Sequence, residues 1–321
     1  MLVKSSTPYP QPRIRKPWWI PAVAAVLVAI LVGLAWILWP GASLPPSEML
    51  SEASPAEGDG VASGAGTNAV VDATTTNVPV HIAMLLDEAG QLAAADKLVD
   101  ARLKYLEALK HATSPVVVRQ IEQRVEPVNL TLLFTPRHMP EKVDYVIKRG
   151  DSLGGIASRF GTTAELLQKS NQISNPHRIK VGDRLRVFTG KFELVASKST
   201  HEMVVLMNGE FFKRFKVGTG LHGKTPVGTF VVSDKIPEPS WWPPDGREVP
   251  FGHKDNILGT RWMAVKATGE TPDVRGYGIH GTWAPDSVGK ASSAGCLRMI
   301  NEQVEELFTY LPLGTPLRIN E

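Results

Sequence analysis

The sequence predicts a multidomain chain: an N-terminal transmembrane helix, a helical hairpin, a small βααβ module and a mostly-β C-terminal domain. Three observations predict this order. An uncharged apolar run lies near the N-terminus, residues 40–79 have the Gly, Ala, Ser, Thr and Pro-rich composition of a flexible linker, and short branched strands fill the second half. At 321 residues, the chain is long enough for two or three small domains. The net charge of +3 is modest and the basic residues are scattered, which argues against nucleic-acid binding.

The apolar run spans residues 18–39, and its twenty-two residues carry no charge. As a helix it would be about 33 Å long, enough to cross a bilayer core. Tryptophans lie at both ends and basic residues in 1–17 precede it, which predicts a cytoplasmic N-terminus, an anchor in the cytoplasmic (inner) membrane, and the rest of the chain outside. A cleaved signal peptide is the alternative, because Gly41-Ala42-Ser43 is small, but its apolar region is usually only about 7 to 15 residues.

Residues 80–135 are predicted to form a helical hairpin. Apolar residues at helical spacing predict one amphipathic helix between His81 and Lys110. Pro115 is a favourable first residue for a second helix, which Pro127 is expected to interrupt. We assign this segment no chemistry and favour a spacer or dimerisation element over a peptide-binding groove.

Residues 144–189 read as a strand, two short helices and a returning strand, with caps at Gly150-Asp151-Ser152 and a helix end at Gly161. This segment resembles the LysM module, whose opening is matched by residues 147–153, Ile-Lys-Arg-Gly-Asp-Ser-Leu. The resemblance implies binding to glycans that contain N-acetylglucosamine. Helix capping and turn formation are an alternative explanation for the same residues. The contacts it implies are Gly150, Asp151, Ser152, Leu153, Asn175, Pro176 and Ile179.

The C-terminal segment, residues 192–320, begins with strands. Asn208-Gly209 is the favoured pair for a type I′ turn, which predicts a hairpin of residues 203–207 with residues 211–217. A short helix is expected at 302–311. The loop at 240–244, Ser-Trp-Trp-Pro-Pro, is either a lid that stacks on substrate or two large rings packed onto the sheet.

Cys296 is the only cysteine, and it follows His280 by sixteen residues. A free thiol has a pKa of about 8.5, so a nucleophilic cysteine needs an imidazole or a cation to form the thiolate. His280 and Arg298 are candidates for both roles. A small buried hydrophobe is the alternative, but glycines and serines surround both segments where a core strand would carry branched apolar residues. One cysteine cannot form an internal disulfide.

Gly278 to Thr282, followed by Ser293 to Arg298, resembles the active-site signature of the YkuD-type L,D-transpeptidase catalytic domain. Lys224 to Phe230 and Leu258 to Met263 fit the same family, so the resemblance covers roughly residues 192–320. The chain departs from it at Ala294, where many members carry a second histidine. The fold implied is a β-sandwich-like sheet structure with a short helix.

The resemblance implies a thioester mechanism. Cys296 is expected to attack an amide carbonyl, with His280 moving the protons and the carbonyl of Gly281 orienting the imidazole. Backbone N–H groups of Cys296 and Gly295 are expected to stabilise the negative oxygen. Expected substrate contacts are Arg298, Ser293, Gly295 and Ser292. The alternative for Arg298 is a structural ion pair. The alternative for Ser293 is that its hydroxyl shapes the turn. Neither a cofactor nor a metal is expected.

The implied function is peptidoglycan cross-linking between stem peptides by an L,D-transpeptidase, with membrane and wall as partners. Two alternatives remain open. With water as acceptor, the enzyme would be an L,D-carboxypeptidase that trims tetrapeptide stems. A non-catalytic protein that tethers membrane to wall through its LysM module is the other.

Overall fold

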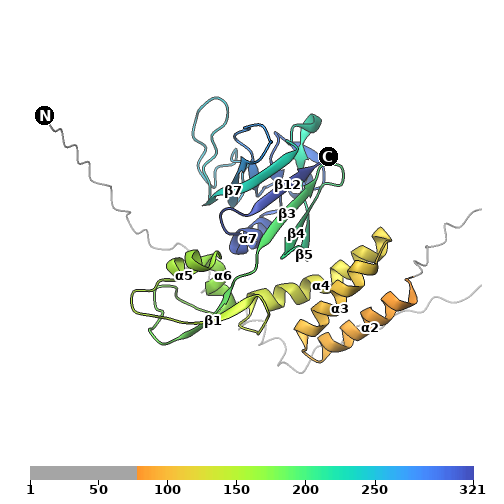
Figure 1. Cartoon of the computed structure of the whole chain (residues 1–321). Coiled ribbons are helices and arrows are strands. Elements are labelled where there is room, and N and C mark those ends of the chain that lie inside the picture. Colours follow the sequence, from red (N-terminus) through yellow and green to blue (C-terminus); the bar gives the residue numbers. More distant parts are fainter. Residues whose placement is uncertain (1–77) are drawn as a thin grey trace, which may run out of the picture. The chain divides into compact units, whose positions relative to one another are not determined.

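The computed structural model describes residues 78–321, so the predicted transmembrane helix at 18–39 and nearly all of the predicted linker lie outside it. Among the residues from 78 onward, no helix is both long and apolar enough to cross a membrane. The helices are α2 Val80–Ala94, α3 Leu98–His111, α4 Pro115–Phe134, α5 Leu153–Phe160, α6 Ala164–Ser170 and α7 Asn301–Tyr310 (Figure 1). The strands are β1 Lys142–Val146, β2 Arg184–Phe188, β3 Phe192–Ser197, β4 Glu202–Met207, β5 Glu210–Lys216, β6 Thr219–Gly220, β7 Gly228–Pro237, β8 Arg261–Ala267, β9 Gly278–His280, β10 Ala291–Ser293, β11 Leu297–Arg298 and β12 Pro316–Asn320.

The helical segment differs from the predicted hairpin in two ways. The single helix expected between His81 and Lys110 is wrong, because Asp96 takes a left-handed φ of 61° and the chain turns between α2 and α3. Apolar spacing continues through this turn since both helices bury a face in the same core. Pro127 does not interrupt α4, which is assigned as one helix of 20 residues.

Helix α4 lies against β5, the edge strand of the large sheet. The Asn129 side-chain amide donates to the carbonyl of Phe212 at 2.9 Å, and the carboxylate of Glu122 accepts from Arg214 at 2.9 and 2.6 Å. The ammonium of Lys142 donates to the carbonyl of Leu132 at 2.5 Å, close to the helix C-terminus. Helix α4 therefore covers a strand edge that would otherwise be free to pair with another chain.

The LysM segment has the predicted βααβ order, with β1 and β2 antiparallel. Ser152 caps α5 by accepting from the N–H of Gly155, and Gly161 ends the helix with a φ of 68°. Thr163 caps α6 in the same way. A small core of its own holds the module: Ile147, Leu153, Ile156, Leu167, Leu185 and Val187.

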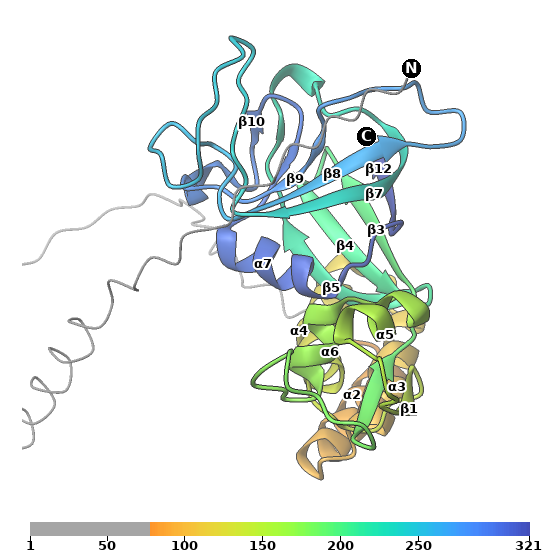
Figure 2. The ribbon, with the colours of Figure 1, turned by 90° about the vertical axis from the view of Figure 1, so that its left-hand side faces the viewer.

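The catalytic segment contains an eight-stranded sheet with the order β11-β9-β8-β7-β12-β3-β4-β5. Asn208 and Gly209 have φ values of 52° and 82°, as the predicted type I′ hairpin turn between β4 and β5 requires. Helix α7 begins one residue earlier than expected and contacts β8 and β9 (Figure 2). The predicted mostly-β domain is therefore confirmed.

Two short parallel pairings bring the catalytic motifs together. In β11 and β9, Leu297 pairs with Ile279 and Arg298 with His280. In β10 and β6, Ser293 pairs with Gly220. Cys296 directly precedes β11 and His280 ends β9, so neighbouring strand ends carry both residues.

Candidate active site

Cys296, His280 and Arg298 line one cavity of about 430 Å³. Its walls come from the ends of β7 and β8, the 239–258 loop between them, β9 with the segment before it, and β11 with the turn that joins it to β10. The structure therefore places the three chemically active residues of the sequence prediction around the same space. The other lining residues are Ile236, Pro239, Ser240, Trp241, Trp242, Pro244, Ile257, Leu258, Trp262, Gly276 and Ala294.

The turn that presents Cys296 is fixed by hydrogen bonds of its own residues. The Ser293 hydroxyl accepts from the N–H of Gly295 at 3.0 Å and donates to the carbonyl of Cys296 at 2.7 Å. Gly295 has a φ of 140°, and a Cβ there would lie 2.5 Å from the Tyr277 ring, so only glycine fits. This arrangement favours the turn-shaping role for Ser293, which is buried.

The hydrogen bond made by the N–H of Gly295 differs from the expected one. It was expected to face the substrate oxygen, but it is committed to Ser293. The N–H of Cys296 donates to no atom of residues 78–321, so it is a donor in this turn that is left for a ligand.

His280 is buried, and its Nδ1 lies 2.6 Å from the carbonyl oxygen of Gly281. A carbonyl only accepts, so Nδ1 carries the proton and Nε2 keeps its lone pair. The Trp262 ring lies 5.9 Å from the imidazole, centroid to centroid, at an angle of 30°. The backbone of Gly281 thus occupies the orienting position that a carboxylate has in a catalytic triad.

The resting pair is neutral. Burial lowers the pKa of His280 to about 4, a change that the carbonyl of Gly281 partly opposes. Burial also raises the pKa of the Cys296 thiol above its ordinary value, against the opposing effects of the Gly278 N–H and the Arg298 guanidinium. The thiol points to the carbonyl of Gly276, with Sγ 3.7 Å from the oxygen. The cavity therefore holds a neutral imidazole and a protonated thiol.

Arg298 contributes an uncompensated positive charge. No carboxylate of residues 78–321 lies within ion-pair distance of its guanidinium, and its buried Nε has no hydrogen-bond partner among them. The structural ion pair considered for Arg298 is therefore absent from this part of the chain. Ser292 is not in the cavity lining, and its hydroxyl donates to the carbonyl of Ser287 at 2.7 Å.

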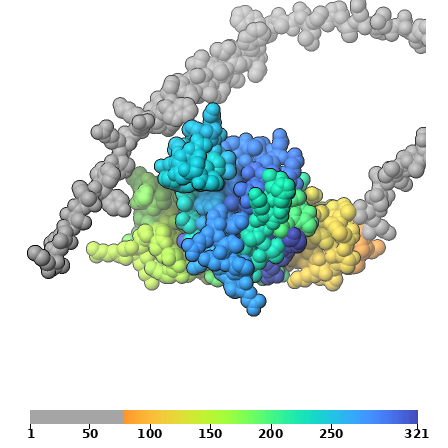
Figure 3. Space-filling view, turned by 90° about the horizontal axis from the view of Figure 1, so that it is seen from above, coloured from red at the N-terminus to blue at the C-terminus, as the bar shows by residue number. Residues whose placement is uncertain are grey.

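The 239–258 loop, here called the lid, carries both Trp241 and Trp242 into the cavity wall. Trp242 is 62% exposed, so it is not packed onto the sheet. In Figure 3 the lid stands out in cyan on the upper surface. Asn256 is 1% exposed and holds the loop together, since its amide donates to the carbonyls of Pro239 and Val249 at 2.8 and 3.1 Å.

The predicted LysM contacts lie far along the chain from this cavity and have structural roles of their own. The carboxylate of Asp151 accepts from Tyr145 and from the N–H of Lys148, and these bonds, the backbone one foremost, lower its pKa. Asn175 closes a turn by accepting from the N–H of His177. Gly150 has a φ of 89°, Ser152 caps α5, Leu153 is in the module core, and Ile179 packs against that core, while Pro176 is half-buried.

Sequence reasoning missed two residues that support the site. Thr225 lies in the quoted motif Lys224 to Phe230, so its position was available but its role was not. It is 1% exposed and bonds the Cys296 turn. Asn256 had no sequence signal, because its partners are backbone carbonyls that only the folded loop brings near. Among residues 78–321, no three His, Cys, Asp or Glu side chains gather where they could hold a metal ion.

Comparisons with known proteins identify relatives of both segments. A model of the L,D-transpeptidase catalytic domain (YkuD) matches residues 191–319, and a model of the LysM domain matches residues 145–188. YqjB of Bacillus subtilis, whose name marks it as a candidate L,D-transpeptidase, is 37% identical over 129 residues, which cover 40% of this chain and 70% of that protein. YkuD of the same organism, named in the same way, is 29% identical over 184 residues, covering 55% and 98%. The solved catalytic domain of an Enterococcus faecium L,D-transpeptidase is 22% identical with a TM-score of 0.31, covering 40% of this chain and 96% of that one.

Proposed function

The chain belongs to the YkuD-type L,D-transpeptidases and is an enzyme of that class, and from this premise we propose that it cross-links peptidoglycan stem peptides through a thioester on Cys296. The observation that carries the proposal is a cavity lined by a thiol, an imidazole with a fixed tautomer and a guanidinium that has no ion-pair partner within residues 78–321. Each of these groups has a role in acyl transfer.

In the first half-reaction, the Cys296 sulfur attacks the carbonyl carbon of the third stem residue, in the amide bond that joins this residue to D-alanine. The thiol proton passes to Nε2 of His280, while the Nδ1 N–H keeps its proton and donates to the carbonyl of Gly281. A carbon–sulfur bond forms, and the carbonyl electrons move onto oxygen, where the free N–H of Cys296 stabilises them. When the carbon–nitrogen bond breaks, the imidazolium gives its proton to the leaving amine and D-alanine departs.

Arg298 is assigned to the carboxylate of that terminal D-alanine. A guanidinium binds a carboxylate through two parallel N–H bonds, and here no protein acid from residue 78 onward competes for it. An ion pair with the substrate carboxylate also offsets the free energy that burial of the Arg298 charge costs. This assignment makes recognition specific for donors with a free C-terminus.

In the second half-reaction, the side-chain amine of another stem attacks the thioester. His280 takes one proton from that amine, the new amide bond forms, and the sulfur leaves and is reprotonated. The lid residue Trp242 covers the cavity with an apolar surface, which limits competition by water. Transfer to an amine is therefore favoured over trimming.

We place the enzyme outside the cytoplasm, anchored by residues 18–39, with the LysM segment holding glycan strands near the catalytic domain. The supporting observations are the uncharged apolar run with its basic N-terminal flank and the LysM match at 145–188. Gly150, Asp151, Ser152, Leu153, Asn175, Pro176 and Ile179 remain the proposed glycan contacts.

The test incubates the full-length chain with purified disaccharide-tetrapeptide, beside a Cys296→Ala control. Cross-linked dimer that depends on Cys296 is the expected product. Tripeptide alone would move the function to an L,D-carboxypeptidase. Folded protein that makes neither product would leave a wall-binding scaffold as the better account.

A further inference from the structure

The Cys296 turn is held from outside by one side chain, that of Thr225 at the end of the β6–β7 connection. Its hydroxyl accepts from the N–H of Gly220 at 2.7 Å and donates to the carbonyl of Gly295 at 2.8 Å. Thr225 is 1% exposed and does not line the cavity, so it is no substrate contact. We propose that Thr225 is a positioning residue that aims the backbone N–H of Cys296 at the oxyanion of the acyl-transfer reaction.

The geometry follows from the planar trans peptide. The carbonyl of Gly295 and the N–H of Cys296 belong to one peptide unit, in which C=O and N–H point in opposite directions. A hydroxyl that fixes the carbonyl therefore fixes the direction of the N–H as well. Because the carbonyl of Gly295 points to Thr225, the N–H of Cys296 points away from Thr225; Cys296 lines the cavity and Thr225 does not.

The surroundings leave this peptide few alternatives. A Cβ on Gly220 would lie 2.8 Å from the Cα of Gly295, and a Cβ on Gly295 would lie 2.5 Å from the Tyr277 ring. The two glycines thus allow Thr225 to approach the turn from one side while Ser293 holds the N–H of Gly295 from the other. Both ends of the Gly295 residue are anchored, and the N–H of Cys296 is left unbonded within residues 78–321.

The inference rests on the proposed acyl-enzyme chemistry, and it predicts how much the acylation rate falls when the Thr225 hydroxyl is lost. An oxyanion donor acts only if it is already aimed at the developing charge, and removing one such donor typically slows reaction by about 100- to 1,000-fold. A donor that is present but misdirected is expected to lose less, about 10- to 100-fold.

The test compares two reactions of the same thiol in the full-length protein. Acylation by disaccharide-tetrapeptide or by imipenem creates a negative oxygen, whereas alkylation by iodoacetamide displaces iodide from a saturated carbon and creates none. Intact-protein mass spectrometry follows both rates. Thr225→Val should slow acylation by about 10- to 100-fold while alkylation keeps the wild-type rate. Thr225→Ser, which keeps the hydroxyl, should restore most of the acylation rate.

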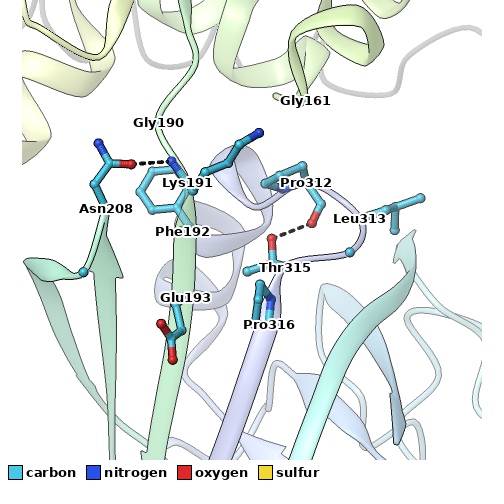
Figure 4. A pocket seen from close by; sticks show the side chains of 12 residues that line it. Gly161, Gly190, Lys191, Phe192, Glu193, Asn208, Pro312, Leu313, Thr315 and Pro316 are labelled. Atoms are coloured by element: carbon cyan, nitrogen blue, oxygen red, sulfur yellow. Dashed lines mark hydrogen bonds between the residues drawn. The ribbon is translucent and has the colours of Figure 1, made fainter. Parts of the chain in front are cut away.

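Thr315→Val is the matched control. Thr315 is 3% exposed, and its hydroxyl also donates to a backbone carbonyl, that of Pro312 at 2.7 Å (Figure 4). It lines a different cavity, so its loss should leave the ratio of the two rates unchanged. If Thr225→Val prevents folding, Thr225→Ala provides the same comparison without the added methyl group.

Three results overturn the inference. Thr225→Val could acylate as fast as wild type, it could lose acylation and alkylation in parallel, or Thr225→Ser could fail to restore acylation. A wild-type protein that acylates with imipenem but not with the stem peptide would refute the proposed function alone, and the Thr225 comparison would still decide the positioning role. A wild-type protein that is alkylated but accepts neither donor refutes both.

Discussion

Lowering the pH should destabilise this protein through one buried imidazole. His280 is 2% exposed, and its pKa in the folded chain is about 4, lowered mainly by burial. In the unfolded chain a histidine titrates at about 6.5. Between these two values the unfolded chain binds a proton that the folded chain does not, so stability falls as pH falls.

The size of the effect follows from the two pKa values. The contribution of His280 is fully present above about pH 7.5, and the linkage relation predicts a loss of about 0.8 kcal/mol by pH 6 and about 2 kcal/mol by pH 5. Near pH 4 the loss approaches about 3 kcal/mol. Other groups also titrate in this range, so the prediction concerns the part of the slope that His280 supplies.

Urea unfolding, followed by tryptophan fluorescence at several pH values, measures this slope in the wild type and in His280→Gln. Four of the eight tryptophans of the chain belong to the catalytic segment, and one of them, Trp262, lies beside the imidazole, so a change in the signal includes the relevant domain. Wild type should lose about 2 kcal/mol more than the variant between pH 7.5 and pH 5. Parallel pH dependence in the two proteins would refute the reasoning, because it would mean that folding does not lower the pKa of His280.

Three further substitutions test other parts of the structure. Tyr310→Phe should raise the free energy of unfolding by about 1 kcal/mol, since the fully buried hydroxyl has no partner within residues 78–321; a lower urea midpoint would contradict this. Arg214→Ala should cost about 1.5 to 3 kcal/mol because it leaves the buried Glu122 with only the longer contact to Arg119, at 3.5 Å, yet acylation should keep its rate, and a slowed acylation would contradict the separation of β5 from the site. Asn256→Ala should slow acylation because the lid loses its internal bonds, measured by intact mass against imipenem; an unchanged rate would show that the lid is held by other contacts.

Much of the LysM and catalytic segments could be predicted because their turns and helix ends depend on neighbouring residues in the sequence. The Asn208-Gly209 pair determines its own turn, and the caps at Ser152 and Gly161 bound α5 from neighbouring residues alone. The paired motifs around His280 and Cys296 gave the catalytic family, which the match at 191–319 confirms, and the opening motif at 147–153 gave the LysM module, which the match at 145–188 confirms.

Errors arose where long-range packing decided the outcome. The helix expected between His81 and Lys110 breaks at Asp96, where the chain turns back so that α2 packs against α3, and α3 packs against α4. The donor role expected for the N–H of Gly295 fails because the Ser293 hydroxyl folds back on it, a contact that depends on the actual dihedral angles of the turn. Neither result has a signature in residue spacing.

The central claim is that a substrate-derived thioester forms on Cys296. The most direct measurement mixes the full-length enzyme with disaccharide-tetrapeptide, quenches with acid at short times, and maps the intact-protein adduct by peptide mass spectrometry. A mass increase equal to the donor minus D-alanine, confined to the peptide that contains Cys296 and absent from Cys296→Ala, is the predicted result. Product formation in Cys296→Ala, or an adduct on any other residue, would contradict the account.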